Sequence, residues 1–217
     1  MKMMRVNLRR NQPMVTSPDV PWHEVIGVEG GNLMLKMLAV CLLVLTALFH
    51  PPRIHALPAK DVQVVLDREY FQVTRALLRD AEKSIRVMMF EANFYTKHPR
   101  SPSNILIGEL ISARKRGLKV EVILEASDRG DRATERNRAT GEMLSREGIE
   151  VTYDPLFVTT HAKLIIIDER ICLLGSTNWT YHSLTSNHEV GVLIESEEVA
   201  RTLGHYFDRV RTSGHKE

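Results

Sequence analysis

The chain has 217 residues, of which 43% are hydrophobic and 26% are charged, and its formal net charge is +2. Residues 1–56 hold 6 Lys or Arg and 3 Asp or Glu, which leaves 23 basic and 24 acidic residues in 57–217. The larger part therefore lacks the broadly basic composition of a general nucleic-acid-binding protein.

An apolar run occupies residues 33–49 and is interrupted only by Lys36 and Thr46. A run of this length is typical of a secretory signal or of a membrane anchor. If translation starts at Met34, residues 33–56 form a signal peptide that is cleaved at its end.

If translation starts at Met1, the basic residues of the tail favour a signal anchor with a cytoplasmic N-terminus. Such an anchor would associate the protein with a membrane through 33–49. We favour the cleaved signal peptide, with 1–32 as an extension that is absent from the mature protein. In both cases 57–217 works outside the cytoplasm, either secreted or periplasmic, or anchored to a membrane.

Residues 57–217 are enough for one domain with a substantial core. Their apolar periodicity predicts strands that alternate with helices. The strands are expected at 62–66, 85–90, 120–124, 149–153 and 190–194, and the helices at 68–83, 103–117, 140–146 and 197–210. Strands separated by helices indicate an α/β sandwich around a mixed β-sheet.

The segment 161–178, HAKLIIIDERICLLGSTN, gathers polar residues around two apolar runs. His161 and Lys163 lie two residues apart at the start of a β-branched run that predicts a strand. Residues two apart on a strand point to the same face, so the imidazole and the ammonium emerge together. Asp168 begins a turn, and the returning strand ends at Gly175, where a small residue allows close backbone approach.

The hairpin returns Ser176 and Asn178 to the neighbourhood of His161. A neutral imidazole can attack phosphorus and form a covalent intermediate. Lys163 and Asn178 can hold the non-bridging oxygens of a phosphate, and Ser176 can donate a further hydrogen bond. The segment therefore predicts a site for phosphodiester chemistry.

The spacing H-x-K-x4-D-x6-G-S-x-N resembles the HKD signature of the phospholipase D superfamily. The resemblance covers nearly all of 57–217 and implies the phospholipase D half-domain, with cleavage of phosphodiesters through a phosphohistidine. It implies that Glu189, the acidic residue after the motif, orients His161. It also implies mainly structural roles for Asp168 and Gly175.

The domain holds a single H-x-K motif, although phosphohistidine chemistry needs a second group to protonate the leaving oxygen and then to activate water. Family members with one motif dimerise so that two motifs meet across a two-fold axis. The resemblance therefore implies a homodimer with the active site at an isologous interface, in which the partner's His161 is the acid and then the base. No metal ion and no other cofactor is expected, because no Cys cluster has zinc spacing.

An arginine-rich segment, 128–138, follows a predicted strand. We expect Arg129, Arg132 and Arg136 to bind phosphates beside the active site, with a solvated loop or helix start as the alternative. Trp179 is a candidate substrate contact by stacking, with packing in the core as the favoured alternative.

The small, secreted, single-motif members that this chain resembles are bacterial EDTA-resistant endonucleases. We therefore expect a metal-independent phosphodiesterase, first a non-specific endonuclease on DNA and RNA. The alternative is a phospholipase D that hydrolyses phosphatidylcholine- or cardiolipin-type phosphodiesters at a membrane, although aromatic residues are few and the motif has no long apolar loop nearby. A third class, a non-catalytic nucleic-acid-binding module, is disfavoured by the intact His161, Lys163 and Asn178.

Overall fold

The computed structural model describes residues 35–42, 56–128 and 130–216. The chain divides into two units, Met1–His55 and Ala56–Glu217, which are described separately. In the first unit residues 35–42 form a helix with exposed side chains, and the predicted extension 1–32 and most of the predicted signal segment lie outside the described residues. Within the described ranges, no helix is long and apolar enough to cross a membrane.

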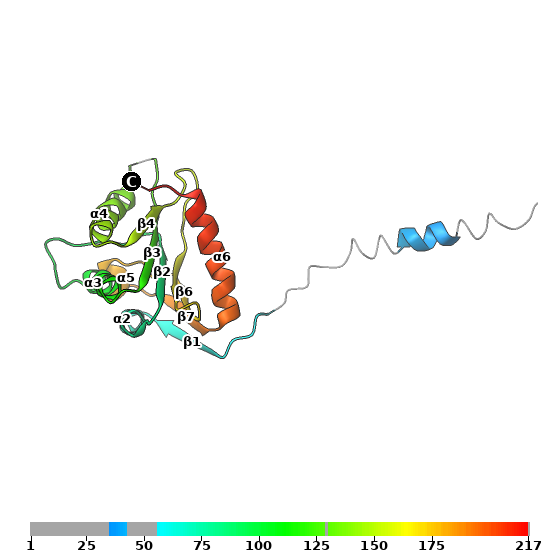
Figure 1. Ribbon diagram of the computed structural model, residues 1–217, viewed down its shortest axis with the longest axis horizontal. Coiled ribbons are helices and arrows are strands. Elements are labelled where there is room, and N and C mark those ends of the chain that lie inside the picture. Colours follow the sequence, from blue (N-terminus) through cyan, green and yellow to red (C-terminus); the bar gives the residue numbers. More distant parts are fainter. Residues whose placement is uncertain (1–34, 43–55, 129, 217) are drawn as a thin grey trace, which may run out of the picture. The chain divides into compact units, whose positions relative to one another are not determined.

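The second unit is built on a seven-stranded sheet with the order β1-β7-β6-β5-β2-β3-β4 (Figure 1). The strands are β1 (Asp61–Leu66), β2 (Ser84–Met89), β3 (Lys119–Leu124), β4 (Glu150–Tyr153), β5 (Lys163–Ile167), β6 (Ile171–Gly175) and β7 (Val190–Glu195). The helices are α2 (Glu69–Asp80), α3 (Pro102–Lys115), α4 (Arg132–Arg146), α5 (Tyr181–Thr185) and α6 (Glu197–Ser213). Strands β2, β3 and β4 pair in parallel and the other neighbours are antiparallel, which confirms the predicted α/β sandwich around a mixed sheet.

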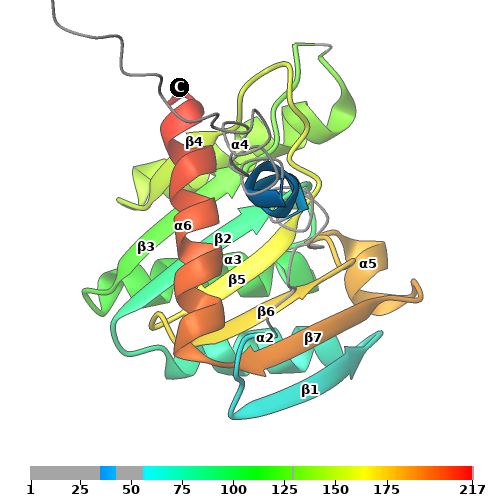
Figure 2. The ribbon, with the colours of Figure 1, turned by 90° about the vertical axis from the view of Figure 1, so that its right-hand side faces the viewer.

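Two hydrophobic clusters hold the layers together. The larger lies between the sheet and α2 and α3, with Leu78 and Leu110 fully buried. The smaller lies under α6, where Phe207 packs on side chains of the central strands. Figure 2 shows α6 alone on one face of the sheet, with α2 and α3 on the other. All five residues of β5 are buried, because helices cover both faces there, and an unbroken apolar run is typical of such a strand.

The helix α4 begins at Arg132 and not at 140, so most of 128–138 is the start of a helix, which was one of the alternatives for this segment. The first half of this helix turns polar residues inward: Thr134 and Asn137 are fully buried. The Asn137 side chain accepts a hydrogen bond from Ala92 N (2.9 Å) and donates to the backbone oxygen of Glu125 (2.8 Å). Apolar periodicity could not reveal a helix whose buried face is hydrogen bonded.

The turn between β5 and β6 is fastened to the start of β2 by one carboxylate. Asp168, at φ 54°, accepts hydrogen bonds from Lys83 N (2.7 Å) and Ser84 N (2.9 Å) with Oδ1. Its Oδ2 accepts from Glu82 N (3.0 Å). Burial raises the pKa of the Asp168 carboxyl, but the three backbone donors lower it by more, so the pKa lies below its usual range.

We expect Asp168→Ala to lower the free energy of unfolding by about 2 kcal/mol at neutral pH, because three N–H groups lose a charged acceptor. The folded-state pKa is depressed, so this stability is present above the unfolded-state value of about 3.9 and is lost as pH falls through the folded-state value. The difference between wild type and variant should therefore shrink in acid, as urea unfolding at neutral and acidic pH would measure.

Glu169→Ala, in the same turn, is the matched control, since no hydrogen bond to the Glu169 carboxylate is found in the described part of the chain. It should leave the free energy of unfolding nearly unchanged. Equal losses at positions 168 and 169 would contradict the fastening role of Asp168.

Candidate active site

The imidazole of His161 lies at the surface, two residues before β5 begins. Its ring packs against the ring of Phe90, which directly follows β2, with centroids 4.8 Å apart and planes tilted by 54°. Within the residues that the structure describes, no hydrogen bond reaches the His161 ring. The imidazole is therefore positioned by ring packing, and its nitrogens are accessible.

The ammonium of Lys163 lies inside the protein, although its neighbour His161 is exposed. Lys163 is 5% exposed, its Nζ donates a hydrogen bond to the backbone oxygen of His161 (2.7 Å), and it lies 4.8 Å from the Phe90 ring centroid. Burial lowers the pKa of Lys163, and the negative charge of Glu189 opposes that shift. No carboxylate of the described residues forms an ion pair with Lys163, so this cation is available to an anionic ligand.

Ser176 and Glu189 are hydrogen bonded across the ends of β6 and β7. The Ser176 hydroxyl donates to Glu189 Oε2 and accepts from Val190 N (3.1 Å). The other oxygen, Glu189 Oε1, accepts from the Asn187 amide (3.3 Å). Over the described ranges Glu189 makes no hydrogen bond with His161, so the orienting role of Glu189 stays a prediction.

Gly175 and Asn178 complete the group of motif residues. A Cβ at position 175 would collide with Val190 O and would lie 2.7 Å from Gly191 Cα, so only glycine lets β6 and β7 approach here. The Oδ1 atom of Asn178 is buried and has no hydrogen-bond partner in the described part of the protein. Buried amide oxygens are usually hydrogen bonded, so this unpaired oxygen is an exception that a partner from outside the described residues would explain.

The structure corrects one candidate contact. Trp179 is 1% exposed, so it packs in the core, as the favoured interpretation predicted, and it presents no face for stacking on a substrate. Its backbone N donates to Glu91 O (2.9 Å), and its backbone oxygen accepts from Asn93 N (3.0 Å). These bonds join the segment after Asn178 to the segment after Phe90.

The three candidate arginines have different positions. Arg132 is exposed at the start of α4, and Arg129 lies outside the described residues. Arg136 forms an ion pair with Glu91, with 2.6 Å between Nη1 and Oε1. Glu91 directly follows Phe90, which packs against His161. Of the two described arginines, only Arg136 is therefore connected to the site through its ion pair.

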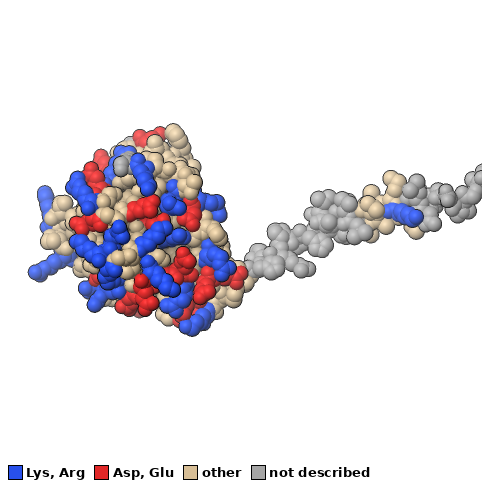
Figure 3. Space-filling view, viewed as in Figure 1, with Lys and Arg blue, Asp and Glu red and all other residues tan. Residues whose placement is uncertain are grey.

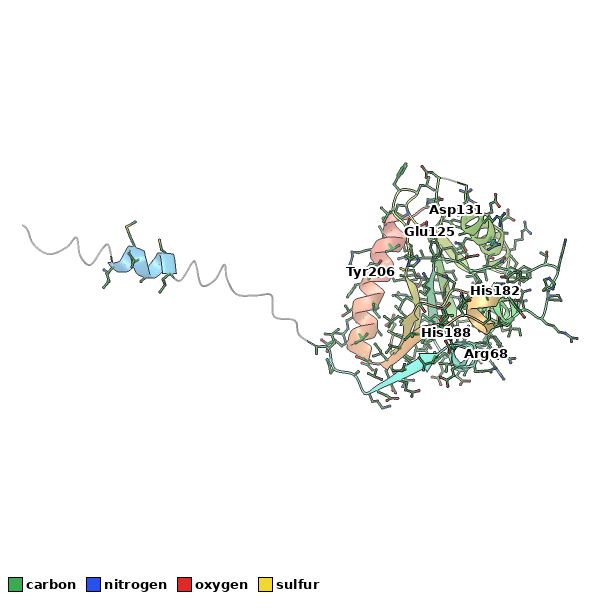
Figure 4. The ribbon with its side chains drawn as sticks, turned by 180° about the vertical axis from the view of Figure 1, so that it is seen from behind. Arg68, Glu125, Asp131, His182, His188 and Tyr206 are labelled. Carbon is green, nitrogen blue, oxygen red and sulfur yellow. The ribbon has the colours of Figure 1, made fainter. Side chains whose placement is uncertain are left out.

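A cleft of about 860 Å³ opens beside the site, between the segment after β2 and the start of α5. Its walls carry two tyrosines, Tyr95 and Tyr181, and three cations, Lys97, Arg100 and Arg136. The Tyr181 N–H donates to the Tyr95 hydroxyl (3.0 Å), which ties the two walls together. His182, labelled in Figure 4, also lines the cleft. Arg136 was among the candidate phosphate contacts predicted from the sequence. Tyr95, Lys97 and Arg100 were missed, because they carry no motif.

A family model described as "Cardiolipin synthase, PLD-like domain" matches residues 74–211. The chain is 30% identical over 96 residues to a mitochondrial cardiolipin hydrolase of Canis lupus familiaris, which covers 44% of this chain and 36% of that protein. It is 28% identical over 141 residues to a phospholipase D of Rickettsia prowazekii (strain Madrid E), covering 64% of this chain and 63% of that protein. The chain thus spans less than two thirds of the length of these curated relatives.

Solved structures show the same fold. Nuc, a phospholipase D family member from Salmonella typhimurium, matches with a TM-score of 0.60 and 25% identity, covering 72% of this chain and 97% of that chain. NucT from Helicobacter pylori matches with a TM-score of 0.54 and 17% identity, which supports the fold alone.

Proposed function

The chain belongs to the phospholipase D superfamily through its PLD-like domain, as its motif predicted, and from that membership we propose that it is a phosphodiesterase that works through a phosphohistidine. One observation carries the proposal. The exposed imidazole of His161 lies beside the buried, unpaired cation of Lys163, and both rest on the ring of Phe90.

In the proposed reaction, a ring nitrogen of His161 attacks phosphorus while the ester oxygen leaves. Lys163 and Asn178 hold the non-bridging oxygens and stabilise the charge that develops on them. Water then attacks the phosphohistidine and restores the imidazole. No metal ion takes part, and a second group must protonate the leaving oxygen and deprotonate the water.

We propose that a second copy of the chain supplies this group, and an uncovered apolar face supports the proposal. α6 packs on the central strands, and Figure 2 shows β1 and β7 beyond it with no helix in front. Val62, Val64, Leu66 and Val190 are between 47% and 63% exposed. Apolar patches of this kind mark association surfaces.

The strand register puts these side chains on the α6 side of the sheet. Val64 lies opposite Val192, which lies opposite Leu174, and Leu174 packs against the cluster under α6. Val190 directly follows Glu189, so the apolar face reaches the active site. An isologous contact here would bring two sites together, with the partner's His161 as acid and then base.

For the substrate, we propose nucleic acid first, because of the cleft whose lining includes Glu91, directly after Phe90, and Thr180, two residues after Asn178. Figure 3 shows Lys and Arg mixed with Asp and Glu over the face that carries α2, α3 and α4, without a large field of one sign. The cleft has a different balance of charge. Three cationic side chains and two tyrosines line it, but only one carboxylate, Glu91. Cations that track phosphates and aromatic rings that stack on bases are the means by which proteins bind single strands.

A phospholipid is the second candidate, and a different observation favours it. The segment that leads to His161 exposes three apolar side chains, Leu156, Phe157 and Val158, at 37%, 87% and 63%. Exposed apolar residues next to a phosphodiester site can enter the interfacial region of a membrane. The sequence indicated no long apolar loop here, and this short one was not anticipated.

We also propose that the domain works outside the cytoplasm, with 33–56 as its signal peptide or signal anchor. The apolar run 33–49 supports this proposal.

We expect His161→Ala to abolish turnover, by a factor of at least about a thousand, while the fold is retained, because no other described side chain is placed to attack phosphorus. The full chain would be incubated in excess EDTA with single-stranded DNA, duplex DNA, RNA and phosphatidylcholine/cardiolipin vesicles. His205→Ala, an exposed histidine on α6, is the matched control and should keep wild-type activity. Substantial residual turnover in His161→Ala, or loss on EDTA that a metal ion restores, would contradict the mechanism.

We expect the wild-type protein to sediment as a dimer, and Val64→Glu to dissociate it and lower turnover at least tenfold, because a carboxylate would be buried in the contact. Gln63→Glu introduces the same group at the next position of β1, on the opposite face, and should leave both properties unchanged. Sedimentation velocity would measure the oligomeric state of the wild type and both variants, and a turnover assay would measure their activity. A fully active monomer would overturn the shared site.

A further inference from the structure

Two acidic side chains are buried beneath the segment that leads into His161. Glu125 directly follows β3 and is 4% exposed, and Asp154 directly follows β4 and is 0% exposed. Both carboxyl groups accept a hydrogen bond from the same donor, the backbone N–H of Thr160, at 2.6 Å from Glu125 Oε2 and 2.8 Å from Asp154 Oδ2. Thr160 immediately precedes His161, so this pair fixes the backbone from which the imidazole projects.

The two carboxyl groups share one N–H donor, so they lie close together in a buried site, and a hydrogen bond between them requires a proton on one of the two. Two ionised carboxylates this close in a buried site would repel, and sharing one proton removes the repulsion. Asp154 uses its other oxygen, Oδ1, to accept from Ala126 N (2.7 Å), so backbone donors hold both oxygens of this carboxyl group in place.

The surroundings of the pair are acidic. Asp131, from the loop before α4, adds a third negative charge that acts on Glu125, and Figure 4 shows the two labelled at the same end of the domain. Lys163, at the start of β5, responds to Glu189 and not to this pair. Within the described residues, no Lys, Arg or His forms an ion pair with Glu125 or Asp154. Burial, first, and the Asp154 carboxyl, second, raise the pKa of Glu125 to about 8, against the lowering by the Thr160 donor.

We propose that Glu125 and Asp154 share a single proton and act as positioning residues, so that the protonated pair holds Thr160 and, through it, His161 in the attacking position. Loss of the proton leaves two charges in the same buried space, and their repulsion releases the segment 154–160. The expected effect on turnover rests on the proposed role of His161. The sharing of a proton by Glu125 and Asp154 does not depend on that role.

The sign of the pH dependence follows from the raised pKa. Between the ordinary value of 4.5 and about 8 the folded protein binds more protons at Glu125 than the unfolded chain does. The stabilisation is therefore fully present below the unfolded-state pKa and is lost as pH rises through the folded-state pKa. Turnover should fall in the same range, because the released segment leads directly into His161.

The test compares Glu125→Gln with wild type in the full chain, since an amide can donate to Asp154 and accept from Thr160 without titrating. The melting temperature and kcat on a phosphodiester substrate would be followed from about pH 6 to about pH 10. In wild type both should decline with a midpoint near pH 8, with kcat affected more than KM. In the variant the melting temperature should stay level through this range, and kcat should lose its decline with a midpoint near pH 8.

Glu142→Gln, an exposed carboxyl on α4 that pairs with Arg146, is the matched control and should keep the wild-type profiles. If Glu125→Gln does not fold, Asp154→Asn serves in its place, because it also ends the need for a shared proton. Profiles of either variant that coincide with wild type would overturn the proposal. The melting temperature can be measured whether or not the protein is active. If the wild-type protein has no activity but the melting temperature of Glu125→Gln stays level with pH, the proposed function is refuted and the proton-sharing pair is retained.

Discussion

A lysine cation that has been removed from water is the constraint around which the site is arranged. Lys163 is almost fully buried at the start of the central strand β5, and its hydrogen bond to the backbone of His161 and its contact with Phe90 do not neutralise its charge. Leaving such a cation unpaired is unfavourable by several kcal/mol, so an anion that reaches it is bound strongly. The exposed imidazole of His161 lies next to this cation, and both contact the ring of Phe90. The proposed substrate phosphate would therefore meet the nucleophile and the cation together.

Carboxyl groups hold the backbone at both ends of β5. The group beyond the C-terminal end is ionised, and the pair before the N-terminal end is proposed to share a proton. Beyond its C-terminal end, the ionised Asp168 accepts three backbone hydrogen bonds and fastens the hairpin turn to β2. Before its N-terminal end, Glu125 and Asp154 converge on Thr160. The hydrogen bonds of Asp168 weaken in acid, and the proposed Glu125–Asp154 pair is disrupted in alkali. The two ends of β5 are therefore most firmly attached to the domain near neutral pH.

Much of this could be predicted from the sequence, because strand and hairpin geometry convert short spacings into proximity. The placing of Lys163 at the start of β5 and of Ser176 just after β6 follows from the predicted hairpin, whereas His161 lies two residues before β5, outside the strand. The Glu125–Asp154 pair could not be predicted in this way, since it depends on the parallel register that sets Leu124 opposite Tyr153. The start of α4 was hidden because its buried face is polar, and the cleft was hidden because its walls come from separate segments.

The stereochemistry at phosphorus tests the central claim most directly. A chiral phosphorothioate diester, hydrolysed by the protein in ¹⁸O-labelled water, gives a product whose configuration can be read by nuclear magnetic resonance. Two successive in-line displacements, one by His161 and one by water, predict overall retention of configuration. Inversion would mean that water attacks phosphorus directly, and it would contradict the covalent intermediate and the nucleophilic role of His161.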